Sequence, residues 1–175
     1  MDGFVAHVAA FRSIDVVDIR PLKTRAANIH FLQFNVSELS PSRFGVADSV
    51  SCLHALEHFG LGRYGDPIAA DGHEQGWKAI ASIVEPGGWV YLPVPIGQRQ
   101  RVEFNGHRVF SVPVLLKLVG SGFSVGALHY VDDHGELHTD VPSDGPEAKS
   151  SFGLRFGRKS TLVPPRLGLR AGFLD

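Results

Sequence analysis

Apolar and polar positions follow two different periods along this chain of 175 residues. Short runs rich in β-branched and aromatic residues predict strands with apolar side chains on both faces, which is typical of a parallel sheet covered on both sides. A helical spacing of Trp77, Ile80, Ala81 and Val84 predicts a helix over about residues 71–84. The predicted strands of this first half are IDVVDIR (14–20), IHFLQFNV (29–36), DSVSCLH (48–54) and WVYLPVP (89–95).

The remaining elements follow from the same patterns. Residues 4–12 suit a short helix before the first strand, and Ser111 and Gly120 bracket a second amphipathic helix. Strands are predicted over 123–131 and 152–160. Only a turn and a polar loop separate these two strands, so we expect an antiparallel pair at the sheet edge, because a parallel pair needs a long crossover. Alternating strands and helices predict an α/β fold.

Composition narrows the class of protein. An apolar fraction of 43%, a charged fraction of 20% and a net charge of −1 indicate a soluble globular chain without a field that attracts nucleic acid or anionic membranes. The single cysteine, Cys52, excludes an internal disulfide framework and a cysteine zinc cluster. We therefore expect a cytoplasmic location and neither a nucleic-acid nor a membrane partner. Residues 1–160 are predicted to form one domain and residues 161–175 an irregular tail.

Four stretches, taken in order, resemble the class I S-adenosylmethionine-dependent methyltransferases. They are VVDIRPL, DSVSCLHALEHFG with its LEH, GWKAIASIVEPGGWVYLPVP with its PGG turn, and HRVFSVPVLLKLVGSGF before the sixth strand of that family. The resemblance covers about residues 3–160. HALEHFGLGRYGDP is also similar to an uncharacterised branch of methyltransferase-like proteins, a domain of unknown function whose substrate is not established.

The resemblance implies a Rossmann-like sheet, mostly parallel, with an antiparallel C-terminal edge strand. It also implies an N-terminal truncation, because family members carry a strand and a glycine-rich loop before DGFVAHVAAF, and Gly3 would be the last glycine of that loop. That strand would lie between the strands over 14–20 and 48–54. These two strands should then close up, accept another segment between them, or leave a marginally stable fold.

The resemblance implies S-adenosylmethionine as cofactor and places its contacts at the carboxyl ends of the strands. Asp18 would accept the ribose hydroxyls, and Asn35 with Val36 would contact the adenine. Leu53 and His54 would border the cofactor cleft. The competing interpretations are a solvated acid at a strand end for Asp18 and an ordinary loop residue for Asn35, which stands where the family often has an aspartate.

The loop LGRYGDP and the residues before it carry the candidate catalytic chemistry. His58 or Asp66 would take a proton from an acceptor hydroxyl, while Arg63 and Tyr64 would bind the acceptor. The competing interpretation is a turn in which Asp66 caps backbone amides. No metal site is expected, because His54 and His58 lack the H-E-x-x-H order of zinc helices.

The sequence thus predicts a methyltransferase-like protein that acts on a small hydroxylated or sugar-like acceptor. The alternative is a catalytically inactive remnant of such an enzyme that serves as a binding or scaffold module. A nicotinamide-dependent oxidoreductase fits less well, because it requires G-x-G-x-x-G before the first helix. The oligomeric state stays open.

Overall fold

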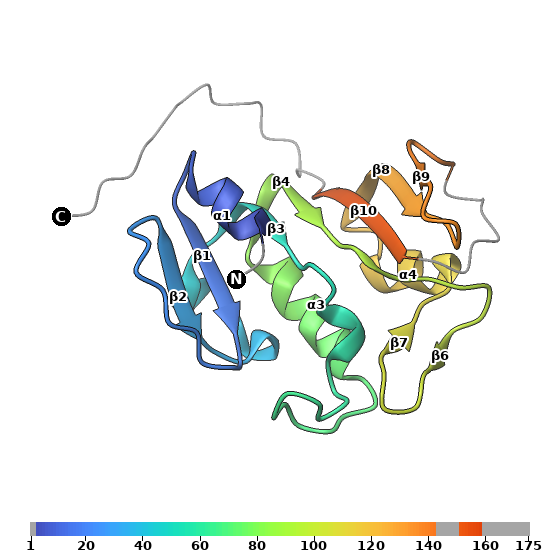
Figure 1. The fold of residues 1–175 in the computed structure, drawn as a ribbon, viewed down its shortest axis with the longest axis horizontal. Coiled ribbons are helices and arrows are strands. Elements are labelled where there is room, and N and C mark those ends of the chain that lie inside the picture. Colours follow the sequence, from blue (N-terminus) through green and yellow to red (C-terminus); the bar gives the residue numbers. More distant parts are fainter. Residues whose placement is uncertain (1–2, 143–150, 159–175) are drawn as a thin grey trace.

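The computed structural model describes residues 3–142 and 151–158 of the chain (Figure 1). The predicted tail at 161–175 lies outside these residues, so the proposed division into domain and tail stays a prediction. All three predicted helices are present, as α1 (Gly3–Ala9), α3 (Gly72–Ser82) and α4 (Val112–Val119). No helix within the described ranges has the length and apolar character needed to cross a bilayer.

The first two strands form a small parallel sheet of their own. β1 (Ile14–Asp18) pairs with β2 (Ile29–Gln33) in a register that runs from Ile14 opposite Ile29 to Asp18 opposite Gln33. Helix α1 contacts β1, and the three elements lie together at the left of Figure 1. We call α1, β1 and β2 the N-terminal arm. Both strands lie within strands predicted from the sequence, over 14–20 and 29–36.

The larger sheet contains six strands in the order β3-β4-β10-β8-β9, with β5 paired to β10. Only β3 and β4 pair in parallel here, and the ladders of β10 with its neighbours and of β8 with β9 are antiparallel. The bounds are β3 Ala47–Ser51, β4 Val84–Tyr91, β5 Val94–Pro95, β8 Phe123–Val131, β9 Leu137–His138 and β10 Ser151–Arg158. We call this sheet with its helices the main body.

Two details of the predicted topology need correction. The antiparallel orientation of the last strand is confirmed, but β10 lies between β4 and β8 instead of at the edge, which β9 occupies. Loop length fixes the orientation of a strand pair, whereas the free edge of β4 decides where the last strand docks. Parallel pairing is confined to β1 with β2 and β3 with β4, so the described sheet is not mostly parallel.

The described residues place no strand between β1 and β3, and these two strands do not pair with each other. The two strands have therefore not closed up, and no other described strand fills the place between them. An ion pair crosses between the two sheets: Nη2 of Arg12 lies 3.1 Å from both carboxylate oxygens of Asp48 in β3.

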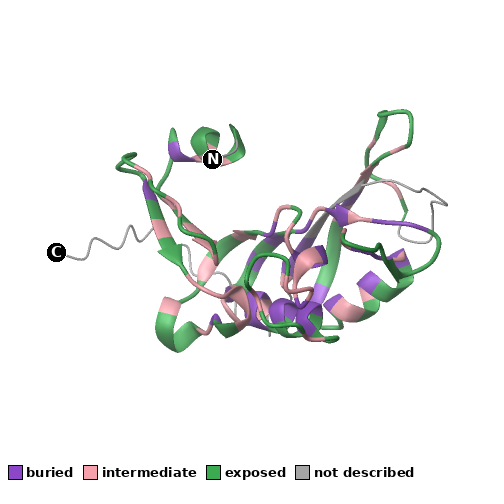
Figure 2. Cartoon of the chain, turned by 60° about the horizontal axis from the view of Figure 1, so that its bottom comes forward, coloured by how far each residue is buried: buried purple, intermediate pink, exposed green. Residues whose placement is uncertain are grey.

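The hydrophobic core lies in the main body. Trp77 and Ile80 from α3 and Leu115 from α4 pack with sheet residues such as Val90 and Phe156. All five are at most 4% exposed. Figure 2 shows the buried residues gathered there, while the arm is largely exposed or intermediate. The carboxyl ends of β3 and β4 are therefore carried by the most rigidly packed part of the molecule.

Several short elements were not predicted from the sequence. They are η1 (Val36–Glu38), α2 (Pro41–Phe44), η2 (Leu56–His58) and a hairpin of β6 (Arg101–Val102) with β7 (Arg108–Val109). The residues EPGG, predicted as a turn, belong to β4, which begins at Val84. Within this stretch Gly87 has a φ of +85°. Short helical turns and two-residue strands carry too few residues for a periodic signal.

Candidate functional site

The candidate site lies where β1, β2 and β3 end. Asp18 is the last residue of β1, Asn35 follows β2 and His54 follows β3. Figure 1 shows β1 ending at the lower edge of the molecule, where the loop after η2 and the β6–β7 hairpin also lie. A direct contact joins these parts, because the Arg20 guanidinium lies 4.6 Å from the centre of the Tyr64 ring in that loop. The edge is thus continuous from the arm to the main body.

Asp18 is held by its neighbour Arg20. Oδ1 accepts hydrogen bonds from the backbone N–H of Arg20 at 2.8 Å and from its Nε at 3.0 Å, and Oδ2 accepts from Nη2 at 2.7 Å. These bonds lower the pKa of Asp18. The carboxylate is therefore charged at neutral pH, and most of its acceptor capacity faces a cation of the same chain.

Asn35 acts as an N-cap. Its Oδ1 accepts hydrogen bonds from the Ser37 backbone N–H at 3.1 Å and from the Ser37 hydroxyl at 2.9 Å. Val36 begins η1 and packs partly buried against the core. These contacts fix the turn after β2 and occupy the Oδ1 atom of Asn35.

The loop from Phe59 to Gly72 is closed at its base by a backbone contact. A Cβ on Gly60 would lie 2.2 Å from the Ala69 carbonyl oxygen, and a Cβ on Gly72 would lie 2.5 Å from the Gly60 Cα. Only glycine permits this approach at both positions. Inside the loop, Oδ2 of Asp66 accepts from the Gly60 N–H at 2.9 Å. The loop is thus a closed unit that ends on α3.

Asp66 makes two further amide contacts. Its Oδ2 accepts from the Gly62 N–H and its Oδ1 from the Tyr64 N–H, each at 3.3 Å. This geometry matches the structural interpretation given above, in which the side chain caps the turn. Arg63 points to the neighbouring hairpin, where its Nη1 donates to the carbonyls of Gly106 at 2.7 Å and Asn105 at 3.3 Å.

His58 stands between two aromatic neighbours. Its ring meets Tyr64 edge-on at 5.4 Å and His107 at 6.1 Å between centroids. Burial, followed by the charges of Arg63 and His107, lowers the pKa of His58. Its Nδ1 is buried and has no hydrogen-bond partner among the described residues. The imidazole is therefore mainly neutral at pH 7, because burial and the nearby charges disfavour its protonated form.

Glu57 and His54 form a pair that sequence reasoning did not connect. Glu57 is only 2% exposed, and burial raises its pKa to about 7. Its Oε1 lies 3.4 Å from Nδ1 of His54, whose side chain is 53% exposed. His54 adopts a φ of +46°, in the left-handed region. The sequence held one signal for this buried acid. Glu57 follows Leu56 and stands two residues before Phe59, and apolar neighbours of this kind indicate a segment that packs against a core.

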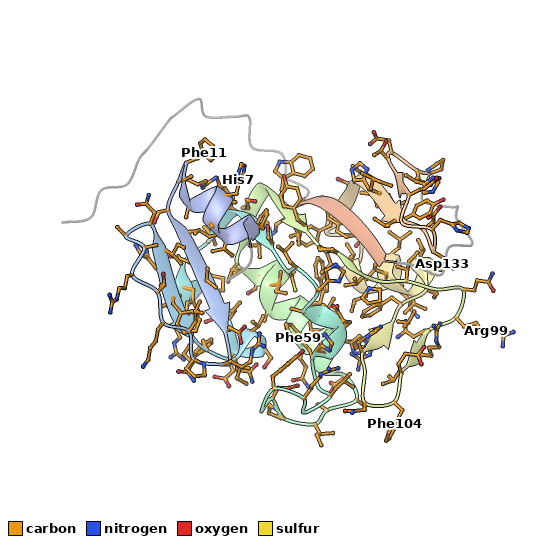
Figure 3. All side chains as sticks on the ribbon, viewed as in Figure 1. His7, Phe11, Phe59, Arg99, Phe104 and Asp133 are labelled. Carbon is orange, nitrogen blue, oxygen red and sulfur yellow. The ribbon has the colours of Figure 1, made fainter. Side chains whose placement is uncertain are left out.

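Two more polar residues are buried on elements that pack against η2. Arg108 is 4% exposed and donates from Nη1 to the Phe59 carbonyl at 3.2 Å, and burial lowers its pKa. His73 of α3 packs against the Phe110 ring at 5.9 Å, and its Nδ1 has no partner in the described part of the chain. The Phe59 side chain lies beside α3 (Figure 3), so close that a Cβ on Gly76 would meet it at 2.2 Å.

The remaining predicted residues lie elsewhere or in supporting positions. Gly3 begins α1 on the exposed surface. Leu53 follows β3 and is partly buried. His54 and His58 do not share a helical face, because helical geometry is confined to η2. Among the described residues, one group has metal-ligand spacing, namely Asp132, Glu136 and His138 at the β8–β9 turn.

The fold is that of class I S-adenosylmethionine-dependent methyltransferases, as the sequence predicted. One solved structure is the Burkholderia thailandensis 1,6-didemethyltoxoflavin-N1-methyltransferase with S-adenosylhomocysteine, with a TM-score of 0.55 and 19% identity over 83% of this chain and 60% of that one. Another is an S-adenosylmethionine-dependent methyltransferase from Methanosarcina mazei, with a TM-score of 0.54 and 13% identity over 90% of this chain and 87% of that one. At these identities the likeness establishes the fold alone.

The chain belongs to the DUF268 family, described as a Caenorhabditis protein of unknown function, whose model matches residues 12–163. A curated relative, the ubiquinone biosynthesis O-methyltransferase of Albidiferax ferrireducens, is 28% identical over 83 residues, or 47% of this chain and 29% of that protein. The chain thus spans less than a third of this curated relative and about 60% of the Burkholderia structure.

Proposed function

We propose that this chain carries out S-adenosylmethionine-dependent methyl transfer to a small hydroxylated or sugar-like acceptor. The observation that carries the proposal is the group of polar side chains at the ends of β1, β2 and β3, which is the edge where open α/β sheets bind ligands. The fold shared with a methyltransferase that holds S-adenosylhomocysteine supports the choice of cofactor.

The cofactor side of the proposal rests on Asp18. A carboxylate offers about four lone-pair sites, and Arg20 donates three N–H groups to it, so one site remains for a ribose hydroxyl. A second hydroxyl bond requires a shift of the Arg20 side chain. In this proposal Asn35 and Val36 flank the adenine, Leu53 and His54 line the cleft, and Gly3 approaches from α1. When bound, the sulfonium supplies an activated methyl group.

The acceptor side consists of the loop after η2. Tyr64 offers a ring face and a hydroxyl, and Arg63, docked on the β6–β7 hairpin, brings a positive charge to the same loop. These groups would orient a hydroxylated molecule. The sequence-based candidates for the base are His58, which is neutral at pH 7, and Asp66, whose oxygens already accept three amide hydrogen bonds.

One observation favours the alternative function, a binding or scaffold module without catalysis. The carboxylate assigned to the ribose already accepts three hydrogen bonds from Arg20, and β1, which carries it, belongs to a sheet separate from β3. A protein that has lost its cofactor would keep such an internal pair. Cofactor binding separates the two functions.

Isothermal titration of the chain with S-adenosylhomocysteine tests the proposal. We expect micromolar binding that the Asp18→Asn variant weakens at least about tenfold, since a charge-assisted hydrogen bond to the ribose is lost. The matched control is Asp15→Asn, on the same strand, whose carboxylate pairs with His30 at 3.2 Å on the exposed surface. Absence of binding to the unmodified chain would reject the enzyme and favour the binding module.

A further inference from the structure

The buried carboxyl of Glu57 is the least expected polar group in the main body. It lies in η2 among core residues, and its Oε2 has no hydrogen-bond partner among the described residues. Removal of a carboxyl from water is unfavourable unless charged or polar partners compensate for it. A well-packed apolar residue would serve stability better at this position. The position of Glu57 therefore points to a role beyond packing.

His54 is held against this carboxyl by its backbone. A φ of +46° is unfavourable for a residue with a side chain, and the His54 N–H donates to the Pro93 carbonyl at 3.2 Å, which extends the β3–β4 ladder. The turn places Nδ1 3.4 Å from Oε1 of Glu57, while more than half of the imidazole stays exposed. One ring nitrogen thus faces a buried carboxyl, and the ring itself reaches the site edge.

A carboxyl that faces one ring nitrogen, as Glu57 faces Nδ1 of His54, is a feature of histidine general bases. A carboxyl at Nδ1 selects the tautomer with its proton on Nδ1, leaves the lone pair on Nε2, and stabilises the imidazolium that forms. His58 has no such partner, since its Nδ1 is buried without one, and the Asp66 carboxylate is occupied by backbone amides. Among the site residues, His54 is the one whose ring faces a carboxyl across its Nδ1.

We propose that His54 takes the proton of the acceptor hydroxyl, with Glu57 as its positioning residue. This rests on the proposed function. The hydroxyl proton moves to Nε2 of His54 as the bond between acceptor oxygen and methyl carbon forms and the sulfur–methyl bond of the cofactor breaks, which leaves a neutral thioether. The positive charge of the sulfonium is thereby transferred to the imidazolium, beside Glu57.

The tautomer of His54 can be read by ¹⁵N NMR of histidine-labelled protein at pH 8, above the pKa of Glu57. Other titratable or charged groups on the elements packed against η2 are His73, Glu74 and Lys78 of α3 and Arg108 of β7, with Cys52 and His58 close by in the chain. A His54→Gln variant assigns the signal. We expect mainly the Nδ1–H form in the unmodified chain. In Glu57→Leu the ratio of Nδ1–H to Nε2–H should fall by about tenfold or more, because the facing carboxyl is gone.

Glu57→Gln is the conservative variant. Its amide oxygen can still accept from Nδ1–H, so it should retain part of the tautomer preference that Glu57→Leu loses, whereas a merely structural role would leave the tautomer ratio unchanged in both. A matched control is Glu74→Gln on the exposed side of α3. The same tautomer ratio in the unmodified chain and in Glu57→Leu would overturn the proposal that Glu57 positions His54.

Titration with S-adenosylhomocysteine, run on the same samples, separates this inference from the proposed function. Binding by the unmodified chain and by Glu57→Leu, together with the tautomer change, supports a proton acceptor in a working site. Absence of binding by the unmodified chain rejects the methyl-transfer step, whatever the tautomer. Cofactor binding with the same tautomer ratio in the unmodified chain and in Glu57→Leu rejects only the role of the Glu57–His54 pair. His58 and Asp66 then stay the candidates for the base.

Discussion

The N-terminal arm and the main body each contain one pair of parallel strands, yet they differ in burial. In the arm only Ala9 of α1 and Ile29 of β2 are buried. In the main body β4 buries three of its positions, and the core around it includes α3 and α4. A hollow of about 340 Å³ lies between α1 and the start of β2. Apolar strand sequence therefore does not by itself bury a strand.

The difference comes from what covers each sheet. β4 is hydrogen-bonded on both sides, by β3 and β10, whereas β1 has β2 as its single strand partner among the described residues. Both faces of a parallel sheet need a second layer before its side chains leave water. The main body has this layer. The arm contributes Asp18 to the candidate site, and Arg20, the partner of Asp18, contacts the loop after η2.

The largest expected effect contrasts two strand leucines. Leu128 in β8 is 1% exposed and Leu32 in β2 is 36% exposed. Leu128→Ala should lower the free energy of unfolding by about 2–5 kcal/mol, because it leaves a cavity in the core, whereas Leu32→Ala should cost under ~1 kcal/mol. Urea denaturation of both variants measures this. Equal losses would mean that the arm is packed as tightly as the main body.

The pH dependence of stability tests the buried acid of the main body. Burial raises the pKa of Glu57 from 4.5 to about 7, so between these values the folded state binds more protons than the unfolded state. The contribution of Glu57 to stability is therefore present below pH 4.5 and is lost as the pH rises to about 7, by at most ~3 kcal/mol. We expect Glu57→Gln to remove this loss.

The measurement is the free energy of unfolding of both proteins at several pH values between 4.5 and 8. The difference curve isolates Glu57 from His58 and His73, whose lowered pKa values act in the opposite direction in the same range. A difference curve that stays flat with pH would mean that the Glu57 carboxyl is solvated. At this position the main body would then be no better buried than the arm.

The loop after η2 should behave as part of the main body. Gly60 and Gly65 both have positive φ, but a Cβ on Gly60 would meet the Ala69 carbonyl oxygen, whereas a Cβ on Gly65 has no atom within 4 Å. Gly65→Ala should cost about 1 kcal/mol from backbone strain, and Gly60→Ala about 2 kcal/mol or more, because the loop base must open. Thermal unfolding of both variants compares them. A cost at Gly60 no larger than at Gly65 would show a loose loop.

Sequence reasoning succeeded where a periodic pattern determines an element by itself. The helix carrying Trp77 and Ile80, the strand over 123–131 and the antiparallel orientation of the last strand are all confirmed. It did not recover the place of β10 in the sheet or the exposure of the arm, because both depend on which edges and faces find partners. The same holds for the Glu57–His54 pair, which depends on a left-handed backbone that no periodicity encodes.

The smallest expected effect concerns the ion pair that joins the two regions. The side chains of Arg12 and Asp48 are 60% and 57% exposed, so solvent screens their charges. A double-mutant cycle with Arg12→Ala and Asp48→Ala should give a coupling of under ~1 kcal/mol, which falls further at high salt. A coupling well above this value would mean that the arm is fastened rigidly to β3. It would also mean that Asp18 is held in place relative to His54 by the fold itself, without help from a ligand.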